Sequence, residues 1–219
     1  KRQDHVQGQT QTENRQAQRA ATSDAVLRHG GKGEDIRHLQ DTLNKLGYRD
    51  HQGRVLSEDG DFGDRTREAL QAYQQAHGLK VDGIAGPQTL EALKKSEQAP
   101  LLSDPRHPDN AMFQQALEGM ERLGPQAFKS RQEMENAAAV AVFEARASGL
   151  KKIDHVMQSS NGTGLFAVQG APNDPAHHRV HLDRIQAAAQ PIEKSTVQIQ
   201  QEIQPNAQQD REQQRSLKL

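Results

Sequence analysis

The sequence contains one motif twice: Asp59-Gly60-x-x-Gly63-x-x-Thr66-x-x-Ala69-Leu70 and, 23 residues later, Asp82-Gly83-x-x-Gly86-x-x-Thr89-x-x-Ala92-Leu93. An Asp-Gly pair is typical of a tight turn, the next glycine can precede a helix, and the Ala-Leu pair marks a helix face that packs on a core. Two copies of one turn-and-helix unit predict a compact helical bundle with paired glycine-rich loops.

A further helix is predicted ahead of the repeat. Large aliphatic residues recur at three- and four-residue steps (36, 39, 43 and 46), and Gly47 can end that helix. The first helix of the repeat would end near Gly78. The second would begin at Pro87, where a proline in the first turn removes no hydrogen bond. Together, the three helices predict a first domain over residues 25–96.

A second domain, over residues 106–195, combines two periodicities. Apolar stripes predict helices at 112–123 and 134–145, whereas residues 153–157 and 165–168 are typical of short strands. The loop between these strands contains Asn161-Gly162, a strong hairpin signal. A last helix is predicted from Asp174-Pro175 to about Ala189. This combination predicts a small α+β unit with a β-hairpin.

The two ends of the chain are rich in glutamine, with six among residues 1–24 and eight among residues 196–219. Such segments bury too little apolar surface to offset the entropy of ordering, so they are interpreted as a disordered linker and a disordered tail. A short polar link is predicted at 97–105. The predicted fold class is therefore mainly α: a three-helix bundle plus a small α+β domain, flanked by disordered Gln-rich tails.

Composition excludes several classes of function. With 28 basic and 29 acidic residues the formal net charge is −1, which argues against polybasic binding to nucleic acid or to a membrane surface. The chain has no cysteine, hence no disulfide, thiolate nucleophile or Cys-based zinc site. No apolar run approaches the roughly 18–20 residues of a membrane span. The first 24 residues are polar and begin without Met, so we expect no signal peptide and a piece of a longer protein.

The candidate chemical motifs have simpler explanations. The run His177-His178-x-x-His181 resembles a metal cluster, but it lacks the glutamate of a metalloprotease helix, and surface histidines explain it. The spacing Asp59-x-Asp61-x-x-Asp64 does not fit an EF-hand. No pair of glutamates (positions 118, 121, 133, 135 and 144) is marked as convergent for glycoside hydrolysis. We therefore predict no catalytic residue, metal or cofactor.

Three of the seven aromatic residues lie in the first domain: Tyr48, Phe62 and Tyr73. Tyr48 follows the first helix and Phe62 lies in an Asp-Gly loop, where a ring could stack on a sugar or a peptide. For Phe62 and Tyr73 the simpler interpretation, that they fill a small core, is favoured. For Tyr48 both interpretations remain open at the level of sequence.

The first domain resembles the three-helix type of bacterial peptidoglycan-binding domain. The resemblance covers about 70 residues and rests on both Asp-Gly loops and on the Leu39-Gln40 and Tyr73-Gln74 helix positions. It implies non-catalytic attachment to cell-wall peptidoglycan, with the insertion at residues 51–58 reshaping the groove. The residues expected to bind peptidoglycan are Tyr48, Asp61, Phe62, Gly63, Asp82 and Gly83.

The second domain resembles the conserved C-terminal domain of antibacterial type IV secretion effectors of the xanthomonad kind. The resemblance covers about 115 residues and rests mainly on Gly149-Leu150-x-x-Ile153-Asp154-His155-Val156, Leu165-Phe166-Ala167-Val168-Gln169-Gly170 and Asp174-Pro175-Ala176-His177. It implies a secretion signal read by the coupling ATPase of the secretion machine. The residues expected to take part in recognition are Ile153, Asp154, His155, Phe166, Gln169, Asp174 and His177.

Taken together, these resemblances predict the C-terminal part of a toxin that is made in the cytoplasm and exported into the periplasm of rival bacteria. The expected partners are peptidoglycan, the coupling ATPase and, through the full-length toxin, a cognate immunity protein; we expect a monomer. The killing activity is expected in a peptidoglycan hydrolase domain ahead of Lys1. Two alternatives stay open: this chain itself cleaves peptidoglycan, or it is a plain interaction scaffold.

Overall fold

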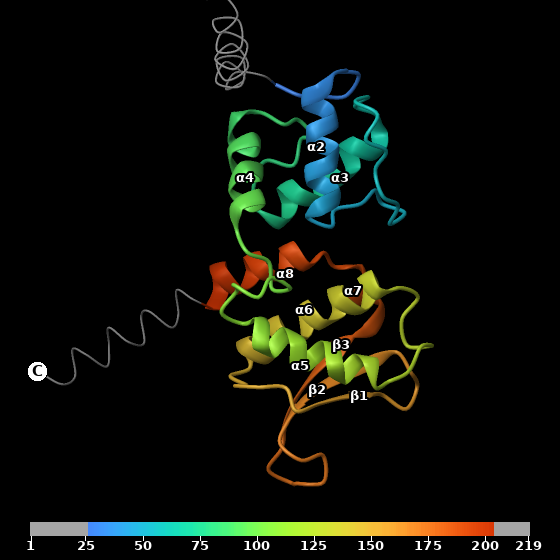
Figure 1. Cartoon of the computed structure of the whole chain (residues 1–219), viewed down its shortest axis with the longest axis vertical. Coiled ribbons are helices and arrows are strands. Elements are labelled where there is room, and N and C mark those ends of the chain that lie inside the picture. Colours follow the sequence, from blue (N-terminus) through green and yellow to red (C-terminus); the bar gives the residue numbers. More distant parts are fainter. Residues whose placement is uncertain (1–25, 204–219) are drawn as a thin grey trace, which may run out of the picture.

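The computed structural model describes residues 26–203, so the predicted linker at 1–24 and most of the predicted tail at 196–219 lie outside the described residues. Two domains follow one another along the chain (Figure 1). The first contains α2 (Glu34–Lys45), α3 (Asp64–Ala76) and α4 (Pro87–Gln98). The second contains α5 (Asn110–Glu121), α6 (Arg131–Ala147), β1 (His155–Gln158), β2 (Gly164–Gln169), β3 (His178–Asp183), α7 (Arg184–Ala189) and α8 (Ile192–Gln198), followed by the π-helical turn η2 (Ile199–Ile203).

The first domain is the predicted three-helix bundle. Its core consists of the apolar faces of the helices together with three aromatic rings, and its largest fully buried side chains include Tyr48, Phe62 and Tyr73. Two short antiparallel bridges, Leu27 with Ala85 and Lys32 with Asp61, join the segment ahead of α2 to the two Asp-Gly loops. The loops and the first turns of the helices therefore gather at one end of the bundle.

The second domain packs a three-stranded antiparallel sheet against α5 and α6. The strand order is β1-β2-β3, with Met157 opposite Phe166 and Phe166 opposite His181. Alternate side chains, including Leu165, Ala167 and Leu182, are buried in the core. The small residues of α6, five of which are alanines with no exposed surface (137, 138, 139, 141 and 145), allow the helix to lie deep in this core.

The predicted last helix over 174–189 is wrong in its first half. Residues 178–183 form strand β3, and only Arg184–Ala189 is helical. The alternation of buried Val180 and Leu182 with exposed neighbours is the period-2 pattern of a half-buried strand. Asp183 then caps α7, because its carboxylate accepts a hydrogen bond from the Gln186 amide at 2.8 Å.

Ordered structure continues past the predicted domain end at residue 195. Helix α8 runs to Gln198, and Thr196 and Ile199 are buried against the rest of the second domain. Over residues 26–203, no helix is both long and apolar enough to cross a membrane.

Candidate functional site

A buried glutamine holds each Asp-Gly loop, which explains the internal repeat. In the first loop Gln40, at 1% exposure, lies with its Nε2 atom 3.0 Å from Asp59 Oδ1, 3.0 Å from the Asp61 carbonyl and 3.1 Å from Thr66 Oγ1. Its Oε1 atom accepts the Gly60 amide at 2.9 Å. Gly60 has φ +75°, a left-handed conformation that favours glycine.

The second loop repeats this network atom for atom. Gln74 Nε2 lies 3.1 Å from Asp82 Oδ1, 3.0 Å from the Ile84 carbonyl and 3.3 Å from Thr89 Oγ1, and its Oε1 accepts the Gly83 amide at 2.9 Å. The backbone amide of Ile84 is the main cause that lowers the pKa of Asp82, as the amide of Asp61 does for Asp59. The paired aspartates are therefore charged structural acceptors that fix the shape of the loops.

The predicted peptidoglycan-binding residues are not all at the surface. Asp61 and Gly63 are exposed, and Asp61 forms an ion pair of 3.1 Å with Lys32. Asp82 is partly exposed, Gly83 is buried, and Phe62 is only 2% exposed because its ring fills the core. As folded, Phe62 offers no ring face to a ligand.

We call the end of the bundle that carries the two Asp-Gly loops the loop end. Two further features of it were not apparent in the sequence. Val81 and Ile84 flank the second Asp-Gly turn as exposed apolar side chains, at 50% and 36%. An open cavity of about 430 Å³ lies at the same end, lined by residues 26–32 and Ile36. The exposed loop end thus combines apolar side chains, the carboxylate of Asp61 and backbone groups.

Tyr48 lies at the opposite end of the bundle from the other predicted binding residues. The Phe62 backbone pairs with Gly30 and Gly31, just ahead of α2, whereas Tyr48 follows the last turn of α2. The 12 residues of α2 separate the two positions by about 18 Å. Tyr48 is 1% exposed, and its hydroxyl donates to Glu193 of the second domain.

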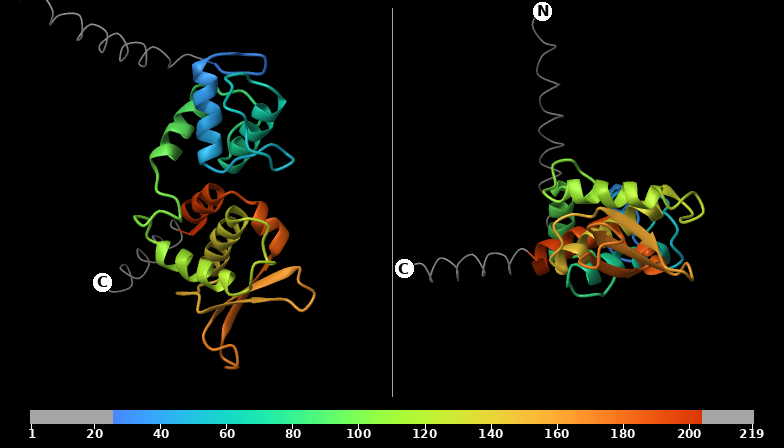
Figure 2. Two further views of the ribbon diagram at one scale, coloured as in Figure 1. Left: turned by 45° about the vertical axis from the view of Figure 1, so that its right-hand side comes forward. Right: turned by 90° about the horizontal axis from the view of Figure 1, so that it is seen from below.

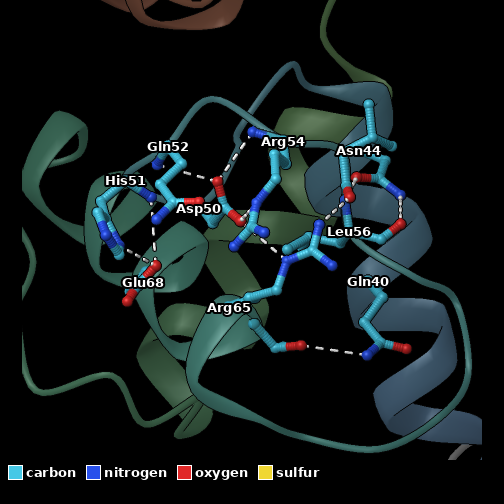
Figure 3. Close-up of polar contacts among 11 residues, drawn as sticks. Gln40, Asn44, Asp50, His51, Gln52, Arg54, Leu56, Arg65 and Glu68 are labelled. Carbon is cyan, nitrogen blue, oxygen red and sulfur yellow. Dashed lines mark hydrogen bonds and ion pairs between the residues drawn. The ribbon is translucent and has the colours of Figure 1, made fainter.

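The insertion after α2, at residues 51–58, is a structured loop held by Asp50, the residue just before it (Figure 3). The buried carboxylate accepts the Gln52 and Arg54 amides at 3.0 and 2.8 Å and the Nε atoms of Arg54 and Arg65 at 2.8 Å each. Burial alone would raise the pKa of Asp50, but the bonds from Arg54 and Arg65 outweigh burial and lower it to about 2.

The far end of the same insertion is held by Asn44. Its amide group donates to the Leu56 carbonyl at 3.0 Å and its carbonyl accepts the Leu56 amide at 2.9 Å, while the Leu56 side chain enters the core. Val55 is left 58% exposed at the edge of the loop. The insertion therefore adds a defined surface beside the N-terminal half of α3.

In the second domain, one face of the sheet is turned away from the helices. The cross-strand register places His155 and Arg179 in one row, and Met157, Phe166 and His181 in the next. The Arg179 guanidinium lies 5.2 Å from the centre of the Phe166 ring, and the rings of Phe166 and His181 are 5.1 Å apart. We call these five residues the outer sheet face.

Of the predicted recognition residues, His155 and Phe166 belong to the outer sheet face, whereas Ile153, Asp154 and Gln169 have structural roles beside it. Ile153 is buried. Asp154 accepts the Gly170 amide at 2.7 Å and pairs with Lys152 at 3.0 Å, and these contacts, the amide first, lower its pKa. Gln169 accepts the amides of Lys151 and Lys152 at 2.6 and 3.2 Å.

The remaining predicted recognition residues lie in the turn before β3. Asp174 is exposed and accepts the Ala176 amide at 2.8 Å, while His177 Nδ1 is 2.5 Å from the Asp174 carbonyl. Three members of the outer sheet face were not predicted. Arg179 and His181 were missed because the segment of β3 was predicted to be helical, and Met157 was placed in a strand but not named as a recognition residue. The only sequence signal for β3 is the pair Val180 and Leu182, two positions apart, which is too short to identify a strand by itself.

Several carboxylates of the described residues are held in ion pairs or hydrogen bonds. Arg131 lies between Glu121 and Glu135, at 2.6 and 2.9 Å, and so neutralises two of the glutamates considered for hydrolysis. A general acid of a glycosidase needs a raised pKa, whereas the pKa values of Asp50, Asp59 and Glu68 are lowered. Over residues 26–203, no cluster of three or more His, Cys, Asp or Glu is placed to hold a metal ion.

Comparison with protein families assigns the two halves. Residues 32–93 match the family model of a peptidoglycan-binding domain, and residues 103–201 match the model described as X-Tfes, XVIPCD. The chain contains both domains, in that order. The peptidoglycan-binding domain includes both Asp-Gly loops, and the XVIPCD, a secretion-signal domain of type IV effectors, includes the outer sheet face and α8. No curated protein matches the chain.

Solved structures resemble parts of the chain. A peptidoglycan-binding protein from Clostridioides difficile, in complex with glutamine hydroxamate, is 34% identical over 32% of this chain and 41% of its own, with a TM-score of 0.29. The SleB N-terminal domain is 37% identical over 33% of this chain and 93% of its own (TM-score 0.30). A Burkholderia AP3 phage endolysin is 32% identical over 53% of this chain and 38% of its own (TM-score 0.29). The chain thus spans less than half the length of the first and third structures.

Proposed function

We propose that this chain is the C-terminal part of an antibacterial type IV secretion effector. The peptidoglycan-binding domain attaches the effector to the cell wall, and the XVIPCD carries the export signal recognised by the coupling ATPase. The observation that carries the proposal is the succession of these two domain families in one chain. Attachment raises the local concentration of the effector at its substrate.

For the wall-binding surface we propose the exposed part of the loop end: Asp61, Gly63, Val81 and Ile84. The burial of Phe62 and the position of Tyr48 favour this surface over the two rings. Asp82 and Gly83 then act indirectly, because they fix the loop that presents Val81 and Ile84.

For the export signal we propose the outer sheet face as the surface read by the coupling ATPase. Its exposed cationic, thioether and aromatic groups offer contacts that a buried residue such as Ile153 cannot offer. Asp154 and Gln169 support this surface through their backbone hydrogen bonds.

The activity of the full-length protein is a further part of the proposal. We propose that a peptidoglycan hydrolase domain lies N-terminal to this chain, that the effector acts in the periplasm of the target cell, and that an immunity protein protects the producer. The two domains found here bring an enzyme to its substrate without supplying the chemistry. A full-length sequence with no hydrolase-like domain ahead of these two would contradict this part.

Co-sedimentation of the whole chain with purified sacculi tests wall binding. We expect the unaltered chain to pellet and Ile84→Asp to reduce the pelleted fraction, because a charge replaces an apolar contact at the loop end. Ile185→Asp is the matched control, since Ile185 is also an exposed isoleucine, at 68%, and lies on α7 of the XVIPCD. Failure of the unaltered chain to pellet would contradict wall binding, and loss of sacculus turbidity would instead indicate that the chain itself cleaves the wall.

A further inference from the structure

A buried carboxylate joins the two domains. Glu193 lies in the first turn of α8 and is 2% exposed. The Tyr48 hydroxyl donates to Glu193 Oε2, His77 Nε2 lies 2.7 Å from Oε1, and Ser96 Oγ donates to Oε1 at 3.0 Å. These three partners come from the ends of α2, α3 and α4, so every helix of the peptidoglycan-binding domain contributes one.

The groups around this carboxylate pack closely. The Tyr73 ring stacks on His77, with 4.1 Å between ring centres, and meets the Tyr48 ring edge-on at 5.3 Å. The Tyr73 hydroxyl is 2.9 Å from Ser96 Oγ. Burial raises the pKa of both tyrosines, so both remain hydroxyl donors. We call Glu193 and these four residues the interdomain junction.

Further contacts lie beside the junction. Pro191, just ahead of α8, lies against Gly47, where an added Cβ would be 3.4 Å from the Pro191 Cβ atom. The same helix is tied to the interdomain segment, because Thr196 Oγ1 accepts the Leu102 amide at 3.2 Å. Figures 1 and 2 show α8 between the three-helix bundle and the rest of the XVIPCD.

The energetics of Glu193 depend on both domains. A carboxylate is costly to bury unless its oxygens are hydrogen-bonded. All three side-chain partners of Glu193 belong to the peptidoglycan-binding domain, so its burial is favourable only when the two domains are docked. Separation would also expose the rings of Tyr48 and Tyr73 and leave their hydroxyls to water.

We propose that the interdomain junction locks the two domains into one rigid unit, with Glu193 as the residue that couples them. The Asp-Gly loops lie at the end of the bundle away from α8, and the hairpin of the XVIPCD points away from the bundle (Figure 2). The lock therefore leaves both proposed binding surfaces uncovered and sets a fixed geometry between them. This inference depends on the contacts of the junction and not on the proposed function.

A distance measurement between two spin labels tests the lock. The chain has no cysteine, so Lys94→Cys on α4 and Lys151→Cys in the XVIPCD give two unique attachment points at exposed positions. We expect one narrow distance distribution in the otherwise unaltered chain and loss of that single distance in Glu193→Ala. Tyr48→Phe removes one hydroxyl, keeps the ring, and should broaden the distribution in the same direction. Glu118→Ala, which removes an exposed glutamate of α5, should leave it narrow.

The outcomes separate cleanly. A broad distribution in the unaltered chain, or a narrow one retained in both Glu193→Ala and Tyr48→Phe, would overturn the proposal. If Glu193→Ala does not fold, the Tyr48→Phe measurement decides. Sacculus co-sedimentation should be unchanged in Tyr48→Phe, because the loop end is distant from the junction. A failure of the lock and a failure of wall binding are therefore distinguishable.

Discussion

At the scale of single residues, the chain uses buried polar side chains to define surfaces. Glutamine is seldom fully buried, yet Gln40 and Gln74 are at most 1% exposed. The repeated Asp-Gly motif predicted the turns, and the Leu-Gln and Tyr-Gln positions formed part of the family resemblance. The hydrogen bonds from each glutamine amide to the Asp-Gly turn and to the following threonine could not be predicted. For Gln40, these partners are 19 to 26 positions away in the sequence.

Replacement of Gln40 tests this role. Gln40→Leu leaves the Gly60 amide and the Thr66 hydroxyl without their buried partner, so we expect the free energy of unfolding to fall by about 2 kcal/mol. Urea unfolding measures the change. Gln52→Leu, at an exposed position of the insertion, should change it little. Equal midpoints for the two variants would show that the amide network contributes nothing.

Asp50 makes the folding stability of the peptidoglycan-binding domain depend on pH in the acid range. Its pKa is about 2 in the folded chain against an ordinary 3.8, so the charged form stabilises the fold above pH 3.8. This stabilisation is lost as the pH falls from about 4 to about 2. We expect the urea midpoint to fall over that window, and Asp50→Asn to lower it at neutral pH and to flatten the dependence. A slope unchanged in Asp50→Asn would assign the dependence to other carboxylates.

At the scale of elements, the sequence predicted helices better than the last strand. The amphipathic patterns of α2, α5 and α6 and the Asn-Gly hairpin gave the right elements, because their periodicity is local. Strand β3 has only Val180 and Leu182 to mark its buried face, and a pair two apart does not decide between a strand and the start of a helix. Its pairing with β2 decides it, and that pairing also creates the outer sheet face.

The outer sheet face and its support make separable predictions. His155→Ala should weaken binding to the coupling ATPase with little effect on stability, since His155 is partly exposed. Asp154→Ala removes the acceptor of the Gly170 amide and should cost about 1–2 kcal/mol of folding free energy. A pull-down with the ATPase and thermal unfolding measure the two effects. Full ATPase binding by both His155→Ala and Arg179→Ala would rule out this face as the docking surface.

At the scale of the whole molecule, the interdomain junction joins the two domains into one unit. The loop end and the outer sheet face lie on opposite sides of this junction. Sequence divided the chain near residue 97 and gave no orientation, because Glu193 and its partners are 97 to 145 positions apart. Tyr48 was expected from the family resemblance to bind peptidoglycan, but in the structure it contacts Glu193 in the junction. The boundary of the XVIPCD also moves outward, since α8 belongs to both its core and the junction.

This geometry predicts simultaneous binding. With the loop end and the outer sheet face uncovered by the junction, attachment to sacculi should not block the XVIPCD. We expect the cytoplasmic part of the coupling ATPase to pellet with sacculi only when the chain is present. Less of it should pellet with the Ile84→Asp chain, which we expect to bind the ATPase normally and the wall more weakly. An ATPase that binds the chain in solution yet stays in the supernatant when the chain pellets would mean that wall attachment hides the export surface. Binding of both partners at once would then require the two domains to separate, which breaks the hydrogen bonds of Glu193.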